Sequence, residues 1–431
     1  MATTLTRRLL QPCRPLLLRP PSALPGSTRG AGPIMAPQFT NPELRQPNHA
    51  RYSSSSSSSS ASPMTTSQRA PAPQSTGRFN YSIAASYIAK DHRFDPSTHI
   101  FHFNPYNRVH QPRQRKSKAL RPHSGQDAFF VSRIGDGTAG AAVALGVADG
   151  VGGWMDSGVD PADFSHGFCD YAAAEASGYR GNGNGKAAAP PLTAKELMQR
   201  GYDAVCHDPA IPAGGSTAVV ALLGEDGNLE VANLGDSGYI HLRLNGVHGH
   251  SSPQTHAFNT PYQLSAVPPS VMRRVAAFGG AQLSDQPSDA DVTRLSVRHG
   301  DVVVFATDGL WDNLFDQDIL RVVSRAMTGT GAWTAAGDAG IDVAPDIEPL
   351  TRLDGGAGAG AGGATLQGLL ATGLVAAAKA ASVNTRMDGP FAKEVKKYYP
   401  LENWRGGKVD DICVVAVVVS EIHDKPVKPR L

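Results

Sequence analysis

The feature that most constrains this chain is a series of short apolar runs that begin or end at an aspartate. Residues 141–148 run into Asp149-Gly150, residues 302–307 run into Asp308-Gly309, and Asp410-Asp411 open the run 412–419. Short β-branched runs bounded by Gly and Asp predict strands. The pattern therefore predicts a β-rich core with several acids at its strand ends.

The spacing of apolar residues in the other segments of the chain predicts further strands and helices, and with them the fold class. Further strands are expected over 216–223, 229–233 and 239–244, and helices over 164–176, 193–207, 317–326 and 365–382. Between the second and third of these strands, Gly235-Asp236-Ser237-Gly238 predicts a hairpin turn that holds Asp236. The helices fall between groups of strands rather than alternating strictly with them, so the pattern favours an α+β fold.

The first 77 residues differ in composition from the rest. Before Glu43 the chain has arginines but no acidic residue, which is typical of a mitochondrial transit peptide. We predict that peptide over 1–52, with a disordered basic tail as the alternative. Residues 53–77 are rich in Ser and Pro and predict a disordered linker. Residues 78–425 predict one large domain, with low-complexity insertions near 181–191 and 328–364.

Charge and hydropathy exclude several classes of protein. Lys and Arg total 40 against 38 Asp and Glu, a balance that argues against a nucleic-acid partner. The chain has no apolar run of the roughly 18 residues that a transmembrane helix needs. Its four cysteines lie far apart and form no CxxC pair, so a zinc site is not expected.

Acids at strand ends can converge on one edge of a sheet. Carboxylates gathered there repel one another, and such a group needs protons or cations to persist. Oxygen ligands favour Mg²⁺ or Mn²⁺ over zinc, and two such ions can activate a shared water and hold an anionic substrate. An Asp-Gly pair alone is equally typical of a turn. The hypothesis of a metal site therefore rests on the whole set of acids.

Six segments in order resemble the protein phosphatase 2C family of metal-dependent serine/threonine phosphatases. The resemblance covers roughly residues 80–420, and the run from Asp149 to Trp154 with Gly158-Val159-Asp160-Pro161 is most similar to the family's mitochondrial branch. The matching segments are Gly125-Gln126-Asp127, Ala148-Asp149-Gly150, Gly215-Ser216-Thr217, Leu234-Gly235-Asp236, Thr307-Asp308-Gly309 and Asp410-Asp411-Ile412.

The resemblance implies a four-layer α-β-β-α sandwich with two central antiparallel sheets, and two Mn²⁺ or Mg²⁺ ions per subunit. Asp149 would bridge both ions and the Gly150 carbonyl would bind one, while Asp149, Asp308 and Asp410 form the catalytic set. The implied metal residues are Asp127, Asp149, Gly150, Asp308, Asp312, Asp410 and Asp411. Arg121 is the candidate ligand for the substrate phosphate.

The implied activity is hydrolysis of phosphoserine and phosphothreonine in phosphorylated protein substrates, by a monomeric mitochondrial enzyme that uses a metal-activated water. Val151 stands where many members have a histidine that is proposed as general acid, so the proton for the leaving group comes from water or from another residue. Three alternatives stay open. They are a catalytically inactive binding module, a hydrolase of small phosphorylated metabolites, and a non-catalytic β-rich structural protein.

Overall fold

The computed structural model describes residues 78–103, 117–135, 142–179, 191–268, 273, 284–337, 340–353 and 364–422. The predicted transit peptide (1–52) and linker (53–77) lie outside these ranges, and so does almost all of the predicted insertion near 181–191. None of the helices in the described ranges is both long enough and apolar enough to cross a membrane.

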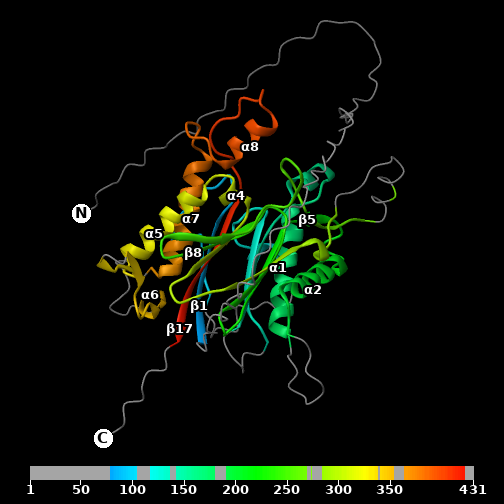
Figure 1. The fold of residues 1–431 in the computed structure, drawn as a ribbon. Coiled ribbons are helices and arrows are strands. Elements are labelled where there is room, and N and C mark those ends of the chain that lie inside the picture. Colours follow the sequence, from blue (N-terminus) through cyan, green and yellow to red (C-terminus); the bar gives the residue numbers. More distant parts are fainter. Residues whose placement is uncertain are drawn as a thin grey trace, which may run out of the picture. The chain divides into compact units, whose positions relative to one another are not determined.

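Two antiparallel sheets form the centre of the described domain (Figure 1). The six-stranded sheet has the order β2 (Ile100–His102), β1 (Arg78–Ile88), β17 (Ile412–Ile422), β14 (Val302–Ala306), β8 (Gly238–Arg243) and β9 (Gly246–His250). The five-stranded sheet has the order β13 (Asp291–Ser296), β7 (Asn228–Leu234), β6 (Ala218–Leu223), β4 (Val143–Asp149) and β3 (Asp127–Arg133).

The apolar run of β17 explains its central place. Val414, Ala416 and Val418 of one face belong to the core beneath the helices, whereas Val415 and Val417 of the other face belong to the core between the sheets. A strand that is buried on both faces is apolar at every position rather than at alternate ones. The continuous β-branched run therefore marks a strand in the interior of a layered structure.

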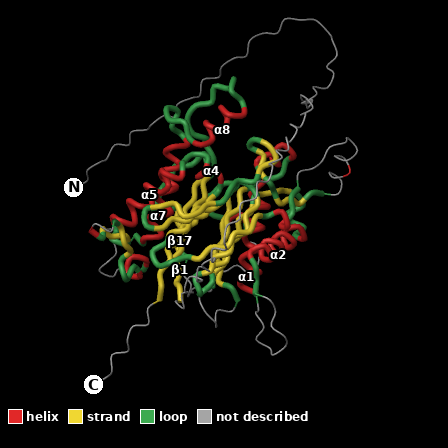
Figure 2. The backbone as a smooth tube through the Cα atoms, in the orientation of Figure 1, coloured by secondary structure: helices red, strands yellow, loops and turns green. Residues whose placement is uncertain are grey.

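Helices cover the outer face of each sheet (Figure 2). α1 (Pro161–Gly178) and α2 (Ala194–His207) pack on the five-stranded sheet, and α5 (Asp316–Gly329) and α7 (Leu366–Ser382) pack on the six-stranded one. The third apolar core lies between the two sheets. The predicted α+β class and the four-layer α-β-β-α sandwich are confirmed.

Smaller elements complete the domain. They are η2 (Lys118–Leu120), η3 (Gly152–Ser157), β5 (Gly214–Ser216), β10 (Thr255–Ala257), β11 (Thr260–Pro261), β12 (Leu264–Ala266), η4 (Pro287–Asp289), α4 (Asp308–Trp311), β15 (Trp333–Ala335), β16 (Ile341–Val343), α6 (Glu348–Thr351) and α8 (Pro390–Tyr398).

The stretch near 328–364, where a low-complexity insertion is predicted, contains regular secondary structure. Residues 328–329 end α5, and β15, β16 and α6 follow. Trp333 and Ile347 are fully buried in the core beneath α5 and α7, and the Trp333 indole N–H donates to the carbonyl of Gly300 at 2.9 Å. These two buried side chains anchor the stretch on the domain. Residues 338–339 and 354–363 lie outside the described ranges.

The predicted hairpin at Asp236 is wrong. β7 pairs with β6 and β13 in one sheet, whereas β8 pairs with β14 and β9 in the other. The Gly235-Asp236-Ser237 segment therefore crosses from one sheet to the other. This crossing places Asp236 at the sandwich edge where the other acids lie. The negative charges of Asp308 and Asp410 are close enough there to raise the pKa of the Asp236 carboxyl.

Candidate metal centre

Four strand ends that carry predicted acids meet at one edge of the sandwich. Asp127 begins β3 and Asp149 ends β4, and these two residues are register partners in the five-stranded sheet. Asp308 follows β14 as the first residue of α4, and Asp410 lies just before β17, the neighbour of β14. Antiparallel neighbours place the start of one strand beside the end of the next. Both sheets thus deliver acids to the same edge.

Hydroxyl groups hold the two acids of the five-stranded sheet. Thr307, at the end of β14, donates from Oγ1 to Asp127 Oδ2 at 2.7 Å, a bond between residues of different sheets. The backbone N–H of Asp149 donates to Thr217 Oγ1 at 3.0 Å, and Thr217 Oγ1 lies 2.7 Å from Ser237 Oγ. These contacts tie the start of β3 to the end of β14, and the end of β4 to the residue before β6.

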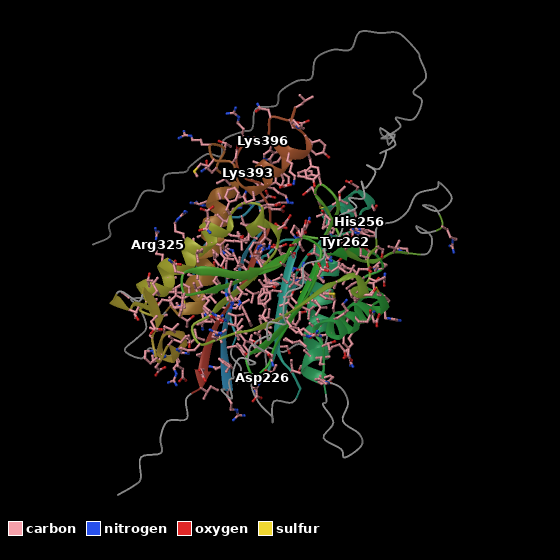
Figure 3. The ribbon with its side chains drawn as sticks, in the orientation of Figure 1. Asp226, His256, Tyr262, Arg325, Lys393 and Lys396 are labelled. Carbon is pink, nitrogen blue, oxygen red and sulfur yellow. The ribbon has the colours of Figure 1, made fainter. Side chains whose placement is uncertain are left out.

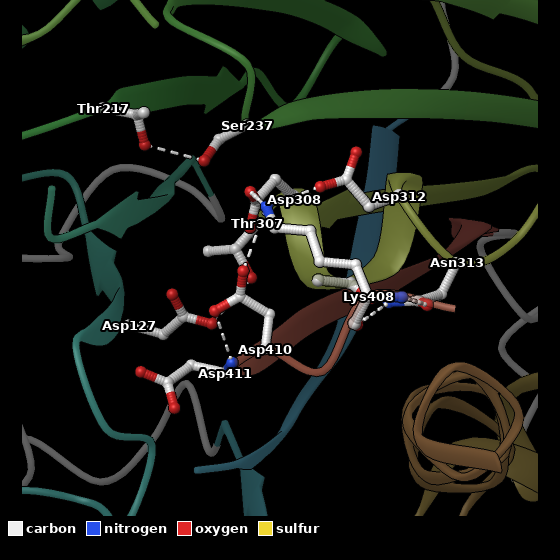
Figure 4. A network of polar contacts seen from close by, with 11 residues as sticks. Asp127, Thr217, Ser237, Thr307, Asp308, Asp312, Asn313, Lys408, Asp410 and Asp411 are labelled. Carbon is white, nitrogen blue, oxygen red and sulfur yellow. Dashed lines mark hydrogen bonds and ion pairs between the residues drawn. The ribbon is translucent and has the colours of Figure 1, made fainter. Parts of the chain in front are cut away.

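The ammonium of Lys408 lies among three of the acids (Figure 4). Its Nζ is 2.5 Å from Asp308 Oδ2, 2.7 Å from Asp312 Oδ2 and 3.0 Å from Asp410 Oδ2. The Asn313 side chain accepts from the Lys408 N–H and donates to the Lys408 carbonyl, both at 2.9 Å. These carboxylates are therefore already gathered around a cation.

Asp411 is used differently from its neighbour Asp410. Its Oδ1 accepts from the backbone N–H of Lys90 at 2.7 Å, and its Oδ2 accepts from that of Gln126 at 2.8 Å. Gly125 has a φ of +69°, and a Cβ there would lie 2.3 Å from the Asp411 carboxylate. Asp411 thus holds the backbone that leads into β3 and the backbone of Lys90, two residues after the end of β1.

Gly150 occupies a position that only glycine fits. Its N–H donates to the Gln126 carbonyl at 3.1 Å, which continues the pairing of β3 and β4 beyond Asp149. A Cβ at Gly150 would lie 2.8 Å from the carbonyl oxygen of Pro161, at the start of α1. The close approach of α1 therefore leaves no room for a side chain at Gly150, which directly follows Asp149.

Burial and mutual repulsion raise the pKa values of most of these acids. The pKa values of Asp127 and Asp149 lie well above the usual range for a carboxyl. Burial is the largest cause, and the charges of neighbouring carboxylates come second. The same causes, with Asp308 as the strongest neighbouring charge, raise the pKa of Asp236 to about 7 and that of Asp312 to about 8. The cluster holds more negative charge than its surroundings neutralise.

Asp308 is the exception, because Lys408 sits against it. Burial acts to raise the pKa of Asp308, but the ammonium and its hydrogen bond outweigh burial and lower that pKa. The reciprocal effect raises the pKa of Lys408 against its own burial, through the carboxylates of Asp308, Asp312 and Asp410. One ammonium therefore offsets part of the charge of the cluster.

The chemistry of these donors fits a hard divalent cation. The donors are carboxylate oxygens held in a largely buried site, which is the ligand type that Mg²⁺ and Mn²⁺ prefer. Within the described ranges, no group of three or more Asp, Glu, His or Cys side chains is arranged so that it could hold a metal ion. Full ligation would require Lys408 to withdraw from its three carboxylates.

Arg121, the candidate phosphate ligand, is tied to α1. Its Nη2 donates to Asp163 Oδ1 at 2.8 Å, and its side chain is mostly buried. It lines a cavity of about 430 Å³ that also reaches Gln126 and Asp411. Arg121 thus lies beside the acid edge, by which we mean the sandwich edge that holds Asp127, Asp149, Asp236, Asp308, Asp312 and Asp410. The ion pair of Arg121 with Asp163 would have to open before Arg121 could reach a phosphate.

Sequence reasoning missed the residues that support the acids. Thr307 and Thr217 lie inside motifs that were recognised, but only the three-dimensional pairing shows that their hydroxyls hold Asp127 and Asp149. Lys408 lies two positions before Asp410, so its proximity to that acid was visible in the sequence. Its contacts with Asp308 and Asp312 depend on the fold.

Comparison with known proteins decides the family. The chain is 32% identical over 299 residues to the protein phosphatase PTC7 homolog fig of Drosophila grimshawi, which covers 69% of this chain and 80% of that protein. The chain belongs to the protein phosphatase 2C family. Its similarity to PTC7-type relatives places it in the mitochondrial branch of this family, and both the family and the branch were predicted from the sequence motifs.

Other comparisons agree with this assignment to the protein phosphatase 2C family. The chain is 29% identical over 320 residues to the mitochondrial protein phosphatase 2C homolog 7 of Saccharomyces cerevisiae, covering 74% of this chain and 81% of that protein. The solved structure of the photosystem II phosphatase PBCP shares the fold, with a TM-score of 0.50, 22% identity, and coverage of 80% of this chain and 99% of that chain. No protein-family model matches the chain.

Proposed function

We propose that this chain hydrolyses phosphoserine and phosphothreonine in proteins, with Asp127, Asp149, Asp308 and Asp410 holding two Mn²⁺ or Mg²⁺ ions. The observation that carries the proposal is the meeting of these four acids, from both sheets, at one edge of the sandwich. Family membership supports the same reaction. The Gly150 carbonyl completes the proposed ligand set, and Asp312 is a further acid beside it.

The ions, when bound, would neutralise the phosphate oxygens and make a water molecule a better nucleophile. The residues of the chain supply the frame for this chemistry. Thr307 orients the Asp127 carboxylate, Thr217 holds the backbone of Asp149, and Asp411 holds the backbone ahead of β3. In the proposed reaction the water oxygen forms a bond to phosphorus as the bond between phosphorus and the serine or threonine oxygen breaks. The leaving oxygen takes a proton from water or from another residue, and inorganic phosphate is released.

A covalent cysteine intermediate is not part of the proposal. Cys413 is the cysteine closest to the acids in the described sequence, being two residues from Asp411, and it is fully buried. Burial, together with the negative charge of Asp127, raises the pKa of its thiol well above the usual value. A thiol of this kind is a poor nucleophile, since the thiolate is the reactive form.

Arg121 remains the proposed phosphate ligand, because it lines the cavity that reaches Gln126 and Asp411. If this role is right, Arg121→Ala should raise KM for a phosphopeptide more than it lowers kcat. Asp163→Asn, which removes the partner of Arg121 without removing the guanidinium, should leave KM unchanged or lower it. A purely structural role would make both variants lose stability without a selective change in KM.

The proposal includes a mitochondrial location and a monomeric state. The acid-free, arginine-rich composition before Glu43 supports import, and the yeast relative carries the word mitochondrial in its name. Residues 1–60 fused to a fluorescent protein should direct it to mitochondria and be processed there. A diffuse cytosolic signal with an uncut N-terminus would contradict the import proposal.

The activity is tested by release of phosphate from a phosphothreonine peptide with and without Mn²⁺. We expect turnover that is lost with excess EDTA and returns with added Mn²⁺ or Mg²⁺. Full activity in EDTA, after elemental analysis has shown that the metal is gone, would refute the role of the ions. Faster turnover of small phosphorylated metabolites than of phosphopeptides would replace proteins as the proposed substrate class.

A further inference from the structure

One surface segment gathers an unusual share of the exposed apolar side chains. Half of the large hydrophobic residues that are exposed in the described part of the chain fall within residues 383–409, which we name the α8 platform. They are Val383, Met387, Tyr398, Tyr399, Leu401, Trp404 and Val409. Gathered exposed apolar residues mark interaction sites, and Tyr, Trp and Met are enriched at protein interfaces.

The α8 platform is also basic. Lys396 and Lys397 have side chains that are 46% and 67% exposed, and Figure 3 shows Lys393 and Lys396 on the same helix. Leaving out Lys408, which is paired with the acids, the basic side chains of the platform (Arg386, Lys393, Lys396, Lys397 and Arg405) outnumber the acidic ones (Asp388, Glu394 and Glu402). Such a surface is complementary to a partner that carries acidic residues.

The platform is bound directly to the acid edge. The N–H of Phe391 in α8 donates to the carbonyl of Asp312 at 3.0 Å, and Lys408, within the same segment, contacts Asp308. Phe391 packs in turn against Trp404, with ring centroids 5.2 Å apart, and against Phe258 of the β10–β11 loop at 5.4 Å. A chain seated on the platform would therefore lie next to the proposed site of hydrolysis.

We propose that the α8 platform docks phosphoprotein substrates in which acidic and large apolar residues flank the phosphorylated serine or threonine. This inference rests on the proposed function and adds a substrate class to it. The exposed aromatic residues would provide apolar contact area, and the positively charged lysines would favour substrates with acidic flanking residues. The attachment of the segment to Asp312 favours a substrate protein over a membrane surface, because it places the docked partner at the acids.

The test compares two phosphothreonine peptides that differ only in their flanks, one with Glu and Leu and one with Ser and Gly, together with p-nitrophenyl phosphate. We expect the wild-type protein to show about a tenfold higher kcat/KM for the Glu/Leu peptide. Tyr399→Ser with Leu401→Ser, and separately Lys397→Glu, should remove most of this preference through KM. Neither change should alter the turnover of p-nitrophenyl phosphate, which has no flanking residues.

Matched controls are available away from the acid edge. Ile422→Ser alters an exposed apolar residue at the opposite end of β17, and Lys195→Glu reverses a half-buried lysine on α2 that donates to the Ser288 carbonyl. Both controls should keep the peptide preference. A melting temperature for every variant separates loss of docking from loss of folding.

Binding without turnover gives a second measurement. Fluorescence anisotropy of the labelled Glu/Leu peptide on Asp149→Asn protein should show about tenfold weaker binding when the platform changes are added. Unchanged preference and unchanged binding would overturn the docking proposal. An effect of the same changes only on sedimentation with anionic vesicles would overturn it in favour of a membrane surface. Absence of turnover by wild type would count against the proposed function, whereas the anisotropy would still decide docking.

Discussion

At the scale of single residues, the acid edge is defined by an excess of negative charge. Lys408 contacts Asp308, Asp312 and Asp410, while the buried Asp127 and the half-buried Asp149 beside them have raised pKa values. Neighbouring carboxylates in a buried site repel one another unless protons or cations compensate them. Substitutions at this edge should therefore affect metal binding and stability in opposite directions.

Asp149→Asn should abolish metal-dependent turnover while leaving the fold intact. It removes one charge from the crowded acids, and the loss of repulsion should raise the melting temperature measured in EDTA by a few degrees. Turnover with Mn²⁺ and the melting temperature with EDTA are the measurements. Asp291→Asn, at the exposed start of β13, is the control and should change neither. Wild-type turnover in Asp149→Asn would remove this residue from the proposed site.

Lys408→Met should destabilise the protein in EDTA and strengthen its binding of Mn²⁺. The ammonium offsets three carboxylates, and removing one partner of a buried ion pair costs about 3–5 kcal/mol. The same ammonium competes with a divalent ion for those oxygens. Differential scanning fluorimetry in EDTA and titration calorimetry with Mn²⁺ measure the two effects.

The control for Lys408 is Lys396→Met, which removes a lysine that pairs with Asp388 and lies outside the acid edge. It should leave the affinity for Mn²⁺ unchanged. If Lys408→Met binds Mn²⁺ no more tightly than wild type, the ammonium and the ions do not share a position.

At the scale of elements, the strands that end in motif aspartates were predictable from local sequence. β4, β14 and β17 are apolar, β-branched and bounded by Asp or Gly, so their limits are visible in the sequence. β10 could not be predicted, since its three residues are all exposed and show no alternation. α8 has so many charged residues that its apolar face, built on Phe391 and Val395, is hard to see.

Pairing between distant strands was the part that local sequence could not supply. Gly235-Asp236-Ser237-Gly238 has the residues of a tight turn, which is why a hairpin was expected. The two strands that it joins are each drawn into a different sheet by partners far along the chain, β13 for one and β14 for the other. The position of Asp236 at the acid edge follows from those pairings.

The segment after α5 allows a prediction about where ordered structure matters. Trp333 is almost fully buried and its indole N–H is bonded to Gly300, so Trp333→Ala should cost about 3–5 kcal/mol and lower the melting temperature by about 5–10 °C. Replacement of Gly355 to Gly363 by a short Gly-Ser link should leave the melting temperature unchanged and should change turnover by no more than a few-fold. Thermal melts and phosphate release on both variants give the comparison. A stable Trp333→Ala protein would show that this stretch contributes little to the core.

At the scale of the whole molecule, the acid edge joins the two sheets. Asp127 and Asp149 come from the five-stranded sheet, and Asp308 and Asp410 come from strands of the six-stranded sheet. A cation held by acids from both sheets binds the folded domain far better than the unfolded chain. By mass action, such a ligand raises stability as its concentration rises above its Kd.

This arrangement predicts how stability depends on pH with and without metal. Asp236 has a pKa of about 7 and Asp312 of about 8, against about 4 in an unfolded chain. A carboxyl whose pKa is raised on folding contributes its full stability below pH 4 and loses it as the pH rises through the folded value. In EDTA the melting temperature should therefore fall between about pH 5 and pH 8.

Divalent ions compete with protons for these oxygens, so the stabilisation by saturating Mn²⁺ should grow over the same range. Melting curves at matched ionic strength measure the gap, which is the difference in melting temperature between saturating Mn²⁺ and EDTA. Asp312→Asn should make this gap grow less as the pH rises. A gap that stays constant from pH 5 to pH 8 would mean that the ions do not bind at these acids.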